Sequence, residues 1–242
     1  MIGALALTLT LEPKFRVLAL YENGGHHIAY SKRARVWLDD LAAKNNFAID
    51  YINDTAPIDE AFLAKYGLFL QLDYPPYAWK PKAAEAFVKY IEEGKGGWIG
   101  FHHATLLGEF DGYKMWDWFS DFMGGIRYQN YIATFAKADV KVEERKHPVM
   151  KGVPTTFPVQ TEEWYTYDRS PRPNVRVLAT VDESTYQPDS KIKMGGDHPV
   201  VWTNPKVKAR NVYIFMGHSP DLFDNEAYKR LFQNAIFWAA KR

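Results

Sequence analysis

The chain has 242 residues, with 30 Lys or Arg against 29 Asp or Glu and a formal net charge of +1. This length suits one large α/β domain or two small ones, with a sizeable core. The balanced charge, without a basic stripe, argues against nucleic acid as a partner, because phosphate binding needs clustered Lys and Arg. The absence of Cys excludes disulfides, thiol catalysis and thiolate zinc sites.

Residues 1–14 are expected to form an N-terminal extension. Ile2 to Leu11 is apolar and breaks at Glu12-Pro13-Lys14, and it is too short to span a bilayer. It is either a signal-peptide remnant or a loosely docked edge strand, although it lacks the flanking signals of a signal peptide. A periplasmic or exported protein of bacterial type and a cytoplasmic one are therefore both compatible with the sequence, and no transmembrane segment is predicted.

The first half of the remaining chain alternates strands with helices. Apolar runs predict strands, and amphipathic segments predict helices. The expected strands are 15–21, 47–52, 68–72 and 98–101, and the expected helices are 29–44, 57–65 and 80–93. This alternation with short connections predicts a three-layer, doubly wound, mostly parallel sheet of the flavodoxin-like type.

After about Phe122 the pattern changes to strands separated by Pro-rich turns. The expected strands are 131–142, 175–181, 200–203 and 212–216, followed by an apolar helix over 226–240. Some of these strands are expected to extend the same sheet in antiparallel fashion. Since the sequence shows no internal repeat and no long linker, residues 15–242 are predicted to be one domain.

Six of the seven histidines are expected at one rim of the sheet, where open α/β sheets bind ligands. They are His26, His27, His102, His103, His198 and His218, all at predicted strand ends. Adjacent residues of an extended chain face opposite ways. We therefore expect His27 rather than His26, and His102 rather than His103, to point into a site. His147 is interpreted as a turn residue.

The histidines suggest two kinds of chemistry. Neutral imidazoles from His27, His102 and His218 can bind a divalent transition metal, zinc or a similar ion. No short metal signature such as HExxH is present, so this site would be assembled from distant segments. The alternative is metal-free acid/base catalysis by histidine with a carboxylate.

Carboxylates and aromatic residues accompany the histidines at this rim. We expect Glu163 or Asp197 to orient an imidazole or bind hydroxyl groups, with Glu22 and Asp221 nearby. The expected substrate contacts are Tyr165, Trp202, His103 and His198, since aromatic faces stack on sugar rings. The sequence has no GxxxxGK[ST], GxGxxG or GxSxG motif, so neither a nucleotide cofactor nor serine-hydrolase chemistry is expected.

Several segments, taken in their order and spacing, resemble the ThuA-like family, which is named for trehalose utilisation and has the class I glutamine amidotransferase-like fold. They are Gly24–His27, Gly100–His102, Glu163–Tyr165, Asp197–Trp202, Met216–Ser219 and Gln233–Ala239. The resemblance runs from about Phe15 to Lys241. It departs from the family at Ile28, where family members often have an acidic residue.

The resemblance places His102 at the nucleophile elbow, where a class I amidotransferase carries its catalytic cysteine. The preceding glycines and the small Ala104 suit such a tight strand-to-helix turn. His218-Ser219-Pro220-Asp221 is similar to the His-Pro-Glu of true amidotransferases, which sets His218 opposite His102. Without cysteine, amidotransferase chemistry itself is excluded.

The resemblance implies sugar metabolism. We expect an enzyme that acts on a glycoside or keto-sugar, with His102, His218, Glu163 and Asp197 as catalytic residues. An isomerase, hydratase or lyase suits these residues better than a retaining glycosidase, which needs two carboxylates about 5 Å apart. A non-catalytic sugar-binding or sensing protein and a metal-dependent amide hydrolase are the alternatives. A homo-oligomer is compatible with the sequence.

Overall fold

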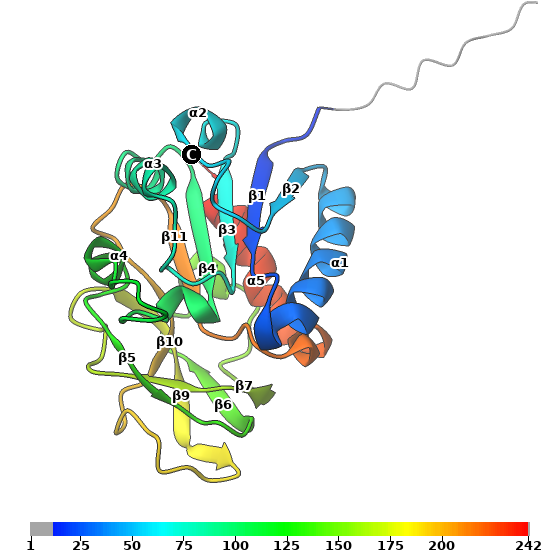
Figure 1. The fold of residues 1–242 in the computed structure, drawn as a ribbon. Helices are drawn as coiled ribbons and strands as arrows, with labels where there is room; N and C mark the ends of the chain where they lie inside the picture. Colours follow the sequence, from blue (N-terminus) through cyan, green and yellow to red (C-terminus); the bar gives the residue numbers. More distant parts are fainter. Residues whose placement is uncertain (1–11, 242) are drawn as a thin grey trace, which may run out of the picture.

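The protein folds around a nine-stranded sheet (Figure 1). The structure is a computed structural model, and it describes residues 12–241. In chain order its strands are β1 (Arg16–Tyr21), β2 (Ala48–Ile52), β3 (Leu68–Leu72), β4 (Gly97–Phe101), β6 (Ala136–Val142), β7 (Thr156–Glu162), β9 (Arg176–Gln187), β10 (Pro199–Thr203) and β11 (Asn211–Ile214). A separate two-stranded sheet pairs β5 (Tyr128–Tyr131) with β8 (Tyr165–Tyr167).

The sheet has a parallel part and an antiparallel part. Its order is β2-β1-β3-β4-β11-β10-β9-β6-β7. The strands from β2 to β11 pair in parallel, whereas β10, β9, β6 and β7 pair antiparallel. The predicted α/β fold with added antiparallel strands is confirmed.

Helices cover both faces of the parallel part, as in a doubly wound fold (Figure 1). They are α1 (Ile28–Asn45), α2 (Glu60–Leu63), α3 (Pro81–Glu92), α4 (Asp117–Phe122) and α5 (Glu226–Ala239). Trp98 of β4 contacts Phe119 of α4 on one face. Phe101 of the same strand contacts Phe232 of α5 on the other face, as the alternation of side chains along a strand requires. None of the described helices is long and apolar enough to cross a membrane.

The structure differs from the sequence prediction mainly in the antiparallel part. The strand expected over 131–142 is broken at 132–135, so that β5 and β6 belong to different sheets. The strand expected over 175–181 continues to Gln187. Strand β7 and helix α4 were not predicted as such. Of the predicted N-terminal extension, residues 1–11 lie outside the described residues, and Lys14 pairs with Asn46 through a backbone hydrogen bond of 2.9 Å.

Candidate active site

His102 occupies a sharp turn at the end of β4. It begins the short 3₁₀ helix η2 (His102–Thr105) with a φ of +36°, a value that is uncommon for any residue except glycine. Its carbonyl oxygen accepts hydrogen bonds of 3.0 Å from the hydroxyls of Thr105 and Tyr213. These buried contacts hold the turn, which is the elbow expected from the sequence.

Gly217 permits the chain after β11 to approach this elbow closely. A Cβ atom at position 217 would lie 2.9 Å from His102 Cβ, 3.0 Å from Phe101 Cβ and 2.7 Å from Asp73 Oδ1. Such short separations would force one of these groups to move. The absence of a side chain at Gly217 therefore allows its neighbour His218 to sit beside His102.

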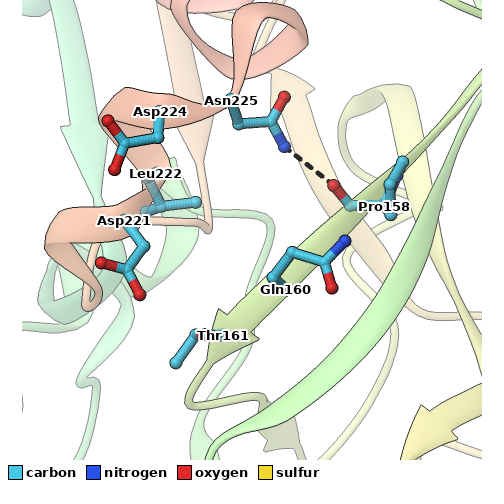
Figure 2. Close-up of a pocket in the computed structure, with 7 residues that line it drawn as sticks. All are labelled: Pro158, Gln160, Thr161, Asp221, Leu222, Asp224 and Asn225. Atoms are coloured by element: carbon cyan, nitrogen blue, oxygen red, sulfur yellow. Dashed lines mark hydrogen bonds between the residues drawn. The ribbon is translucent and has the colours of Figure 1, made fainter.

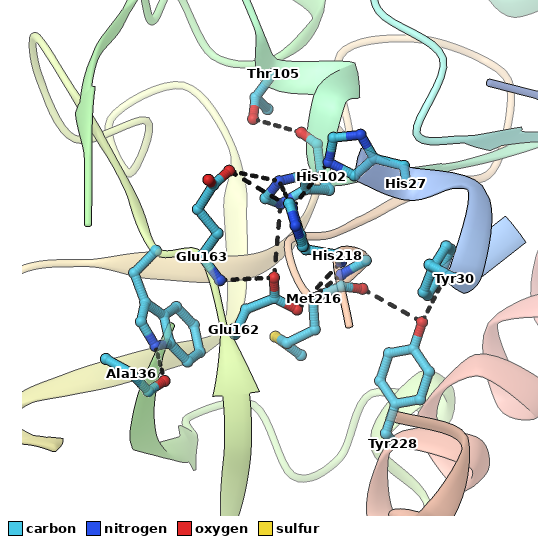
Figure 3. A network of polar contacts seen from close by, with 12 residues as sticks. His27, Tyr30, His102, Thr105, Ala136, Glu162, Glu163, Met216, His218 and Tyr228 are labelled. Carbon is cyan, nitrogen blue, oxygen red and sulfur yellow. Dashed lines mark hydrogen bonds and ion pairs between the residues drawn. The ribbon is translucent and has the colours of Figure 1, made fainter. Parts of the chain in front are cut away.

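Three histidines and one glutamate converge at this point (Figure 3). His218 Nδ1 lies 2.8 Å from His27 Nε2 and 3.3 Å from His102 Nε2. Glu163 Oε2 lies 3.4 Å from His102 Nε2 and 3.5 Å from His218 Nδ1. We call these four residues, His27, His102, Glu163 and His218, the histidine cluster.

The donor set of the histidine cluster fits a divalent transition metal. Ligand atoms about 2.1 Å from a tetrahedral ion lie about 3.4 Å from one another, and three of the four separations above are within about 0.1 Å of this spacing. Burial and the neighbouring imidazoles of His103, His27 and His218 lower the pKa of His102 well below its usual value. His102 is therefore neutral at pH 7, which is the form that binds metal.

Glu22 supports the histidine cluster through its contact with His27. One of its carboxylate oxygens, Oε2, lies 3.2 Å from His27 Nδ1 and 2.8 Å from His103 Nδ1. Burial opposes ionisation of Glu22, but the hydrogen bonds from His103 and His27 outweigh it and hold the pKa at about 2. A carboxylate on the far nitrogen of an imidazole fixes its tautomer and orientation, so Glu22 aims His27 Nε2 at the cluster.

Glu162 is a second supporting side chain, and the sequence prediction did not single it out. It is fully buried at the end of β7. Its Oε2 accepts from the backbone N–H groups of Gly217 and His218 at 3.1 and 3.3 Å, and its Oε1 accepts from that of Glu163 at 2.9 Å. Burial raises its pKa to about 8. Glu162 thus joins the two segments that carry cluster residues.

The cluster opens into a cavity of about 230 Å³. Besides Glu22, His27, Glu163 and His218, this cavity is lined by Gly25, His103, Tyr128, Tyr131 and Tyr165. The Tyr165 ring lies 4.4 Å from the His102 ring, and Tyr128 packs against Tyr165 at 5.1 Å. Contrary to the expected split of the pair, the His102 and His103 rings stack 5.3 Å apart, because the chain is a 3₁₀ turn here and not an extended strand. Acidic, imidazole and phenol groups therefore face the same small space.

Asp197, His198 and Trp202 are not brought into the cluster. Asp197 pairs with Arg172 and accepts a hydrogen bond of 2.6 Å from Ser170. His198 does start an antiparallel strand, but its Nδ1 lies 3.0 Å from Glu183 Oε1. Trp202, further along β10, is buried with its ring 4.3 Å from that of Tyr213.

His147, expected to be a turn residue, caps the 3₁₀ helix η3 (Pro148–Met150).

Another cavity, of about 390 Å³, lies between β7 and the 3₁₀ helix η4 (Pro220–Asp224) (Figure 2). Asn225 closes one side of it by donating a hydrogen bond of 2.8 Å to the carbonyl of Pro158. Of the carboxylates that the sequence placed at the rim, Asp221 lines this cavity. Its lining includes no imidazole, so it lacks the chemistry of the histidine cluster.

Comparison with known proteins identifies relatives of the whole chain. The family model for ThuA, trehalose utilisation, matches residues 16–239. A ThuA-like protein from Bacteroides uniformis is 28% identical with a TM-score of 0.83, over 98% of this chain and 95% of that one. A second, from Parabacteroides merdae, is 20% identical with a TM-score of 0.67, over 95% and 91%. No curated protein matches at a significant level.

The likeness extends to amidotransferase folds. The glutaminase domain of Trypanosoma brucei CTPS, with bound acivicin, has a TM-score of 0.53 at 9% identity, over 93% of this chain and 94% of that one. At this identity the likeness shows the fold alone, and it confirms the predicted class I glutamine amidotransferase-like architecture. Since the family model spans nearly the whole chain, the protein belongs to the ThuA family, whose description, trehalose utilisation, connects it with carbohydrate.

Proposed function

We propose that this protein is a carbohydrate-active enzyme that acts on a glycoside or keto-sugar at the histidine cluster. The observation that carries the proposal is the convergence of His27 Nε2, His102 Nε2, His218 Nδ1 and Glu163 Oε2 at the floor of a tyrosine-lined cavity. Membership of a trehalose utilisation family supports carbohydrate as the substrate class.

The four cluster residues would hold a divalent transition metal, zinc or a similar ion. When bound, such an ion supplies Lewis acidity toward a carbonyl or hydroxyl oxygen. Glu22 and Glu162 keep the ligands in place, the first through His27 and the second through the backbone of His218. The protein would thus present its ligands in advance, without reorganising around the ion.

The remaining lining residues would bind and orient the sugar. His103 lies 2.8 Å from Glu22 through Nδ1, and we expect its other nitrogen to exchange a hydrogen bond or proton with a sugar hydroxyl. Tyr165 and Tyr128 offer ring faces and hydroxyls to the sugar. An imidazole beside a polarised carbonyl suits proton transfer in an isomerase, hydratase or lyase.

Metal content tests the proposal directly. Mass spectrometry on untagged protein should find about one equivalent of a transition metal after loading with zinc. His102→Ala should lose it, whereas His147→Asn, which removes a buried histidine outside the cluster, should retain it. A wild-type protein that binds no metal would contradict the metal site.

Turnover separates the enzyme from a sugar-binding protein. Wild-type protein is incubated with glycosides and their 3-keto derivatives, and products are followed by NMR. We expect turnover that His102→Ala abolishes. Tight binding of these sugars without any product would contradict the enzymatic role and favour a non-catalytic binding or sensing protein.

A further inference from the structure

A second cavity also adjoins the histidine cluster. Its volume is about 460 Å³, compared with about 230 Å³ for the tyrosine-lined cavity at the cluster. Both cavities are lined by Tyr131, Glu163 and His218. Because they share these side chains, they are two lobes of one cleft, with Glu163 and His218 at the junction.

The two lobes differ in chemistry. The first lobe carries Glu22, His27 and His103 in addition to its tyrosines. The second lobe adds Ala29, Ala133, Phe135, Ser219 and Pro220 to the three shared side chains. The groups that suit reaction chemistry therefore lie in the first lobe and at the junction, and the second lobe is mainly apolar.

Phe135 gives the second lobe an exposed aromatic face. It is 47% exposed, although a phenyl ring gains free energy from burial. Its ring lies 4.8 Å from the imidazole of His218, so it stands next to the cluster. Tyr131, 39% exposed, is an aromatic side chain that lines both lobes. Exposed rings beside a reactive centre are suited to stack on a ring of the ligand.

We propose that the second lobe is a binding subsite for a second ring of the substrate, which packs on Phe135 while the reacting sugar occupies the first lobe. The proposal rests on the proposed function and names its substrate class more closely: a glycoside with a ring on its leaving group, not a free monosaccharide. The bond between the two rings then passes Glu163 and His218. Phe135 is a specificity-determining residue in this assignment.

The test compares ligands that differ only in the second ring. Dissociation constants are measured by calorimetry for methyl and phenyl glucosides, and for methyl and phenyl galactosides, in both anomeric forms. In at least one pair the phenyl glycoside should bind about three- to tenfold more tightly than the methyl glycoside, as expected for one aromatic contact. Equal affinities in every pair would overturn the proposal.

Variants of Phe135 locate the contact. Phe135→Ala and Phe135→Leu should remove the preference for the phenyl glycoside, and Phe135→Tyr should keep it. Val36→Ala, which changes a side chain 70% exposed on α1, is the matched control and should leave the preference unchanged. A preference that persists in Phe135→Ala would overturn the assignment.

Binding in His102→Ala distinguishes this proposal from the proposed function. The preference for a second ring should survive in this metal-free variant, because Phe135 is unchanged. If His102→Ala loses the metal or turnover but keeps the preference for the phenyl glycoside, the result supports the subsite independently of the catalytic role. Failure of the wild type to bind any of the glycosides would contradict both the subsite and the sugar-directed function.

Discussion

Burial determines what His102 can do. Its side chain is fully buried at the elbow, and desolvation together with three nearby imidazoles keeps it neutral. A neutral ring has a lone pair to offer to a metal or a proton, whereas a charged ring has none. The surroundings of His102 therefore make an ordinary imidazole suitable as a metal ligand or a base.

Glu22→Gln should weaken metal binding without unfolding the protein. A carboxylate oxygen now serves both His27 Nδ1 and His103 Nδ1, and a neutral amide cannot hold both rings in the same way. Loss of such a supporting carboxylate typically costs about 10- to 100-fold in metal affinity. Competition titration with a zinc chelator measures the loss. Glu109→Gln, an exposed position, should have no effect, and an unchanged affinity in Glu22→Gln would refute the supporting role.

Gly217→Ala should disrupt the site through its backbone. The added methyl group would meet Asp73, His102 and Phe101 at 3.0 Å or less, so His218 must shift away from His102. We expect a loss of about 1–3 kcal/mol in the free energy of unfolding, together with loss of metal binding. Gly24→Ala is the matched control, because a Cβ there meets nothing within 4 Å. Equal effects of the two substitutions on metal binding would argue against the close approach as the cause.

At the scale of elements, the parallel strands were predictable and several later ones were not. Strands β1, β3 and β4 are buried along most of their length, and their sequences are almost entirely apolar, with Arg16 at the start of β1 and Gln71 within β3 as the exceptions. Strand β7 contains Pro158, which removes a backbone donor and is tolerated at a sheet edge. β8 has three residues and α4 has six, too short for a periodic pattern to be read.

The candidate site was predictable as far as strand ends determine it. His27, His102 and His218 follow parallel strands, so the rule for open sheets brings them together. The same rule gathers His198 to the rim but does not say which way its ring turns, and the long strand β9 provides Glu183 as its partner. Glu162 was not predicted because its role depends on the backbone N–H groups of a distant segment.

Asn225 joins helix α5 to the edge strand β7. Its Oδ1 accepts from the N–H groups of Ala227 and Tyr228, and its Nδ2 donates to Pro158 (Figure 2). Asn225→Ala should lower the free energy of unfolding by about 2 kcal/mol, the sum of a helix cap and a hydrogen bond. Asn225→Ser keeps a capping oxygen but is too short to reach β7, so we expect a loss of about 1 kcal/mol. Urea denaturation measures both, and an Asn225→Ser variant as stable as the wild type would show that the bond to β7 contributes nothing.

At the scale of the whole molecule, the site depends on both parts of the sheet. The parallel part and the loops that follow it supply the imidazoles of His27, His102 and His218. The antiparallel part supplies Glu162 at the end of β7 and Glu163 directly after it, and Tyr165 follows in β8 of the two-stranded sheet. Any change that loosens one part against the other should therefore affect the cluster before it unfolds the chain.

Acid should destabilise the whole fold through His147. This ring is buried against Trp238 at 4.7 Å, and burial together with the nearby charge of Arg176 lowers its pKa from 6.5 to about 4. The unfolded chain therefore takes up a proton near pH 6.5, and the folded protein resists it until about pH 4, so stability falls as pH drops through this window. By pH 5 the loss should be about 2 kcal/mol relative to neutral pH.

His147→Asn isolates this contribution. Asparagine can still accept the hydrogen bond from the N–H of Val149 that caps η3, but it does not titrate. Urea denaturation at pH 7.5 and pH 5 gives the free energy of unfolding of both proteins. The wild type should lose about 2 kcal/mol more than His147→Asn between these two values, because every other titrating group is common to both. Parallel losses in the two proteins would mean that His147 takes up its proton as readily in the folded state as in the unfolded one.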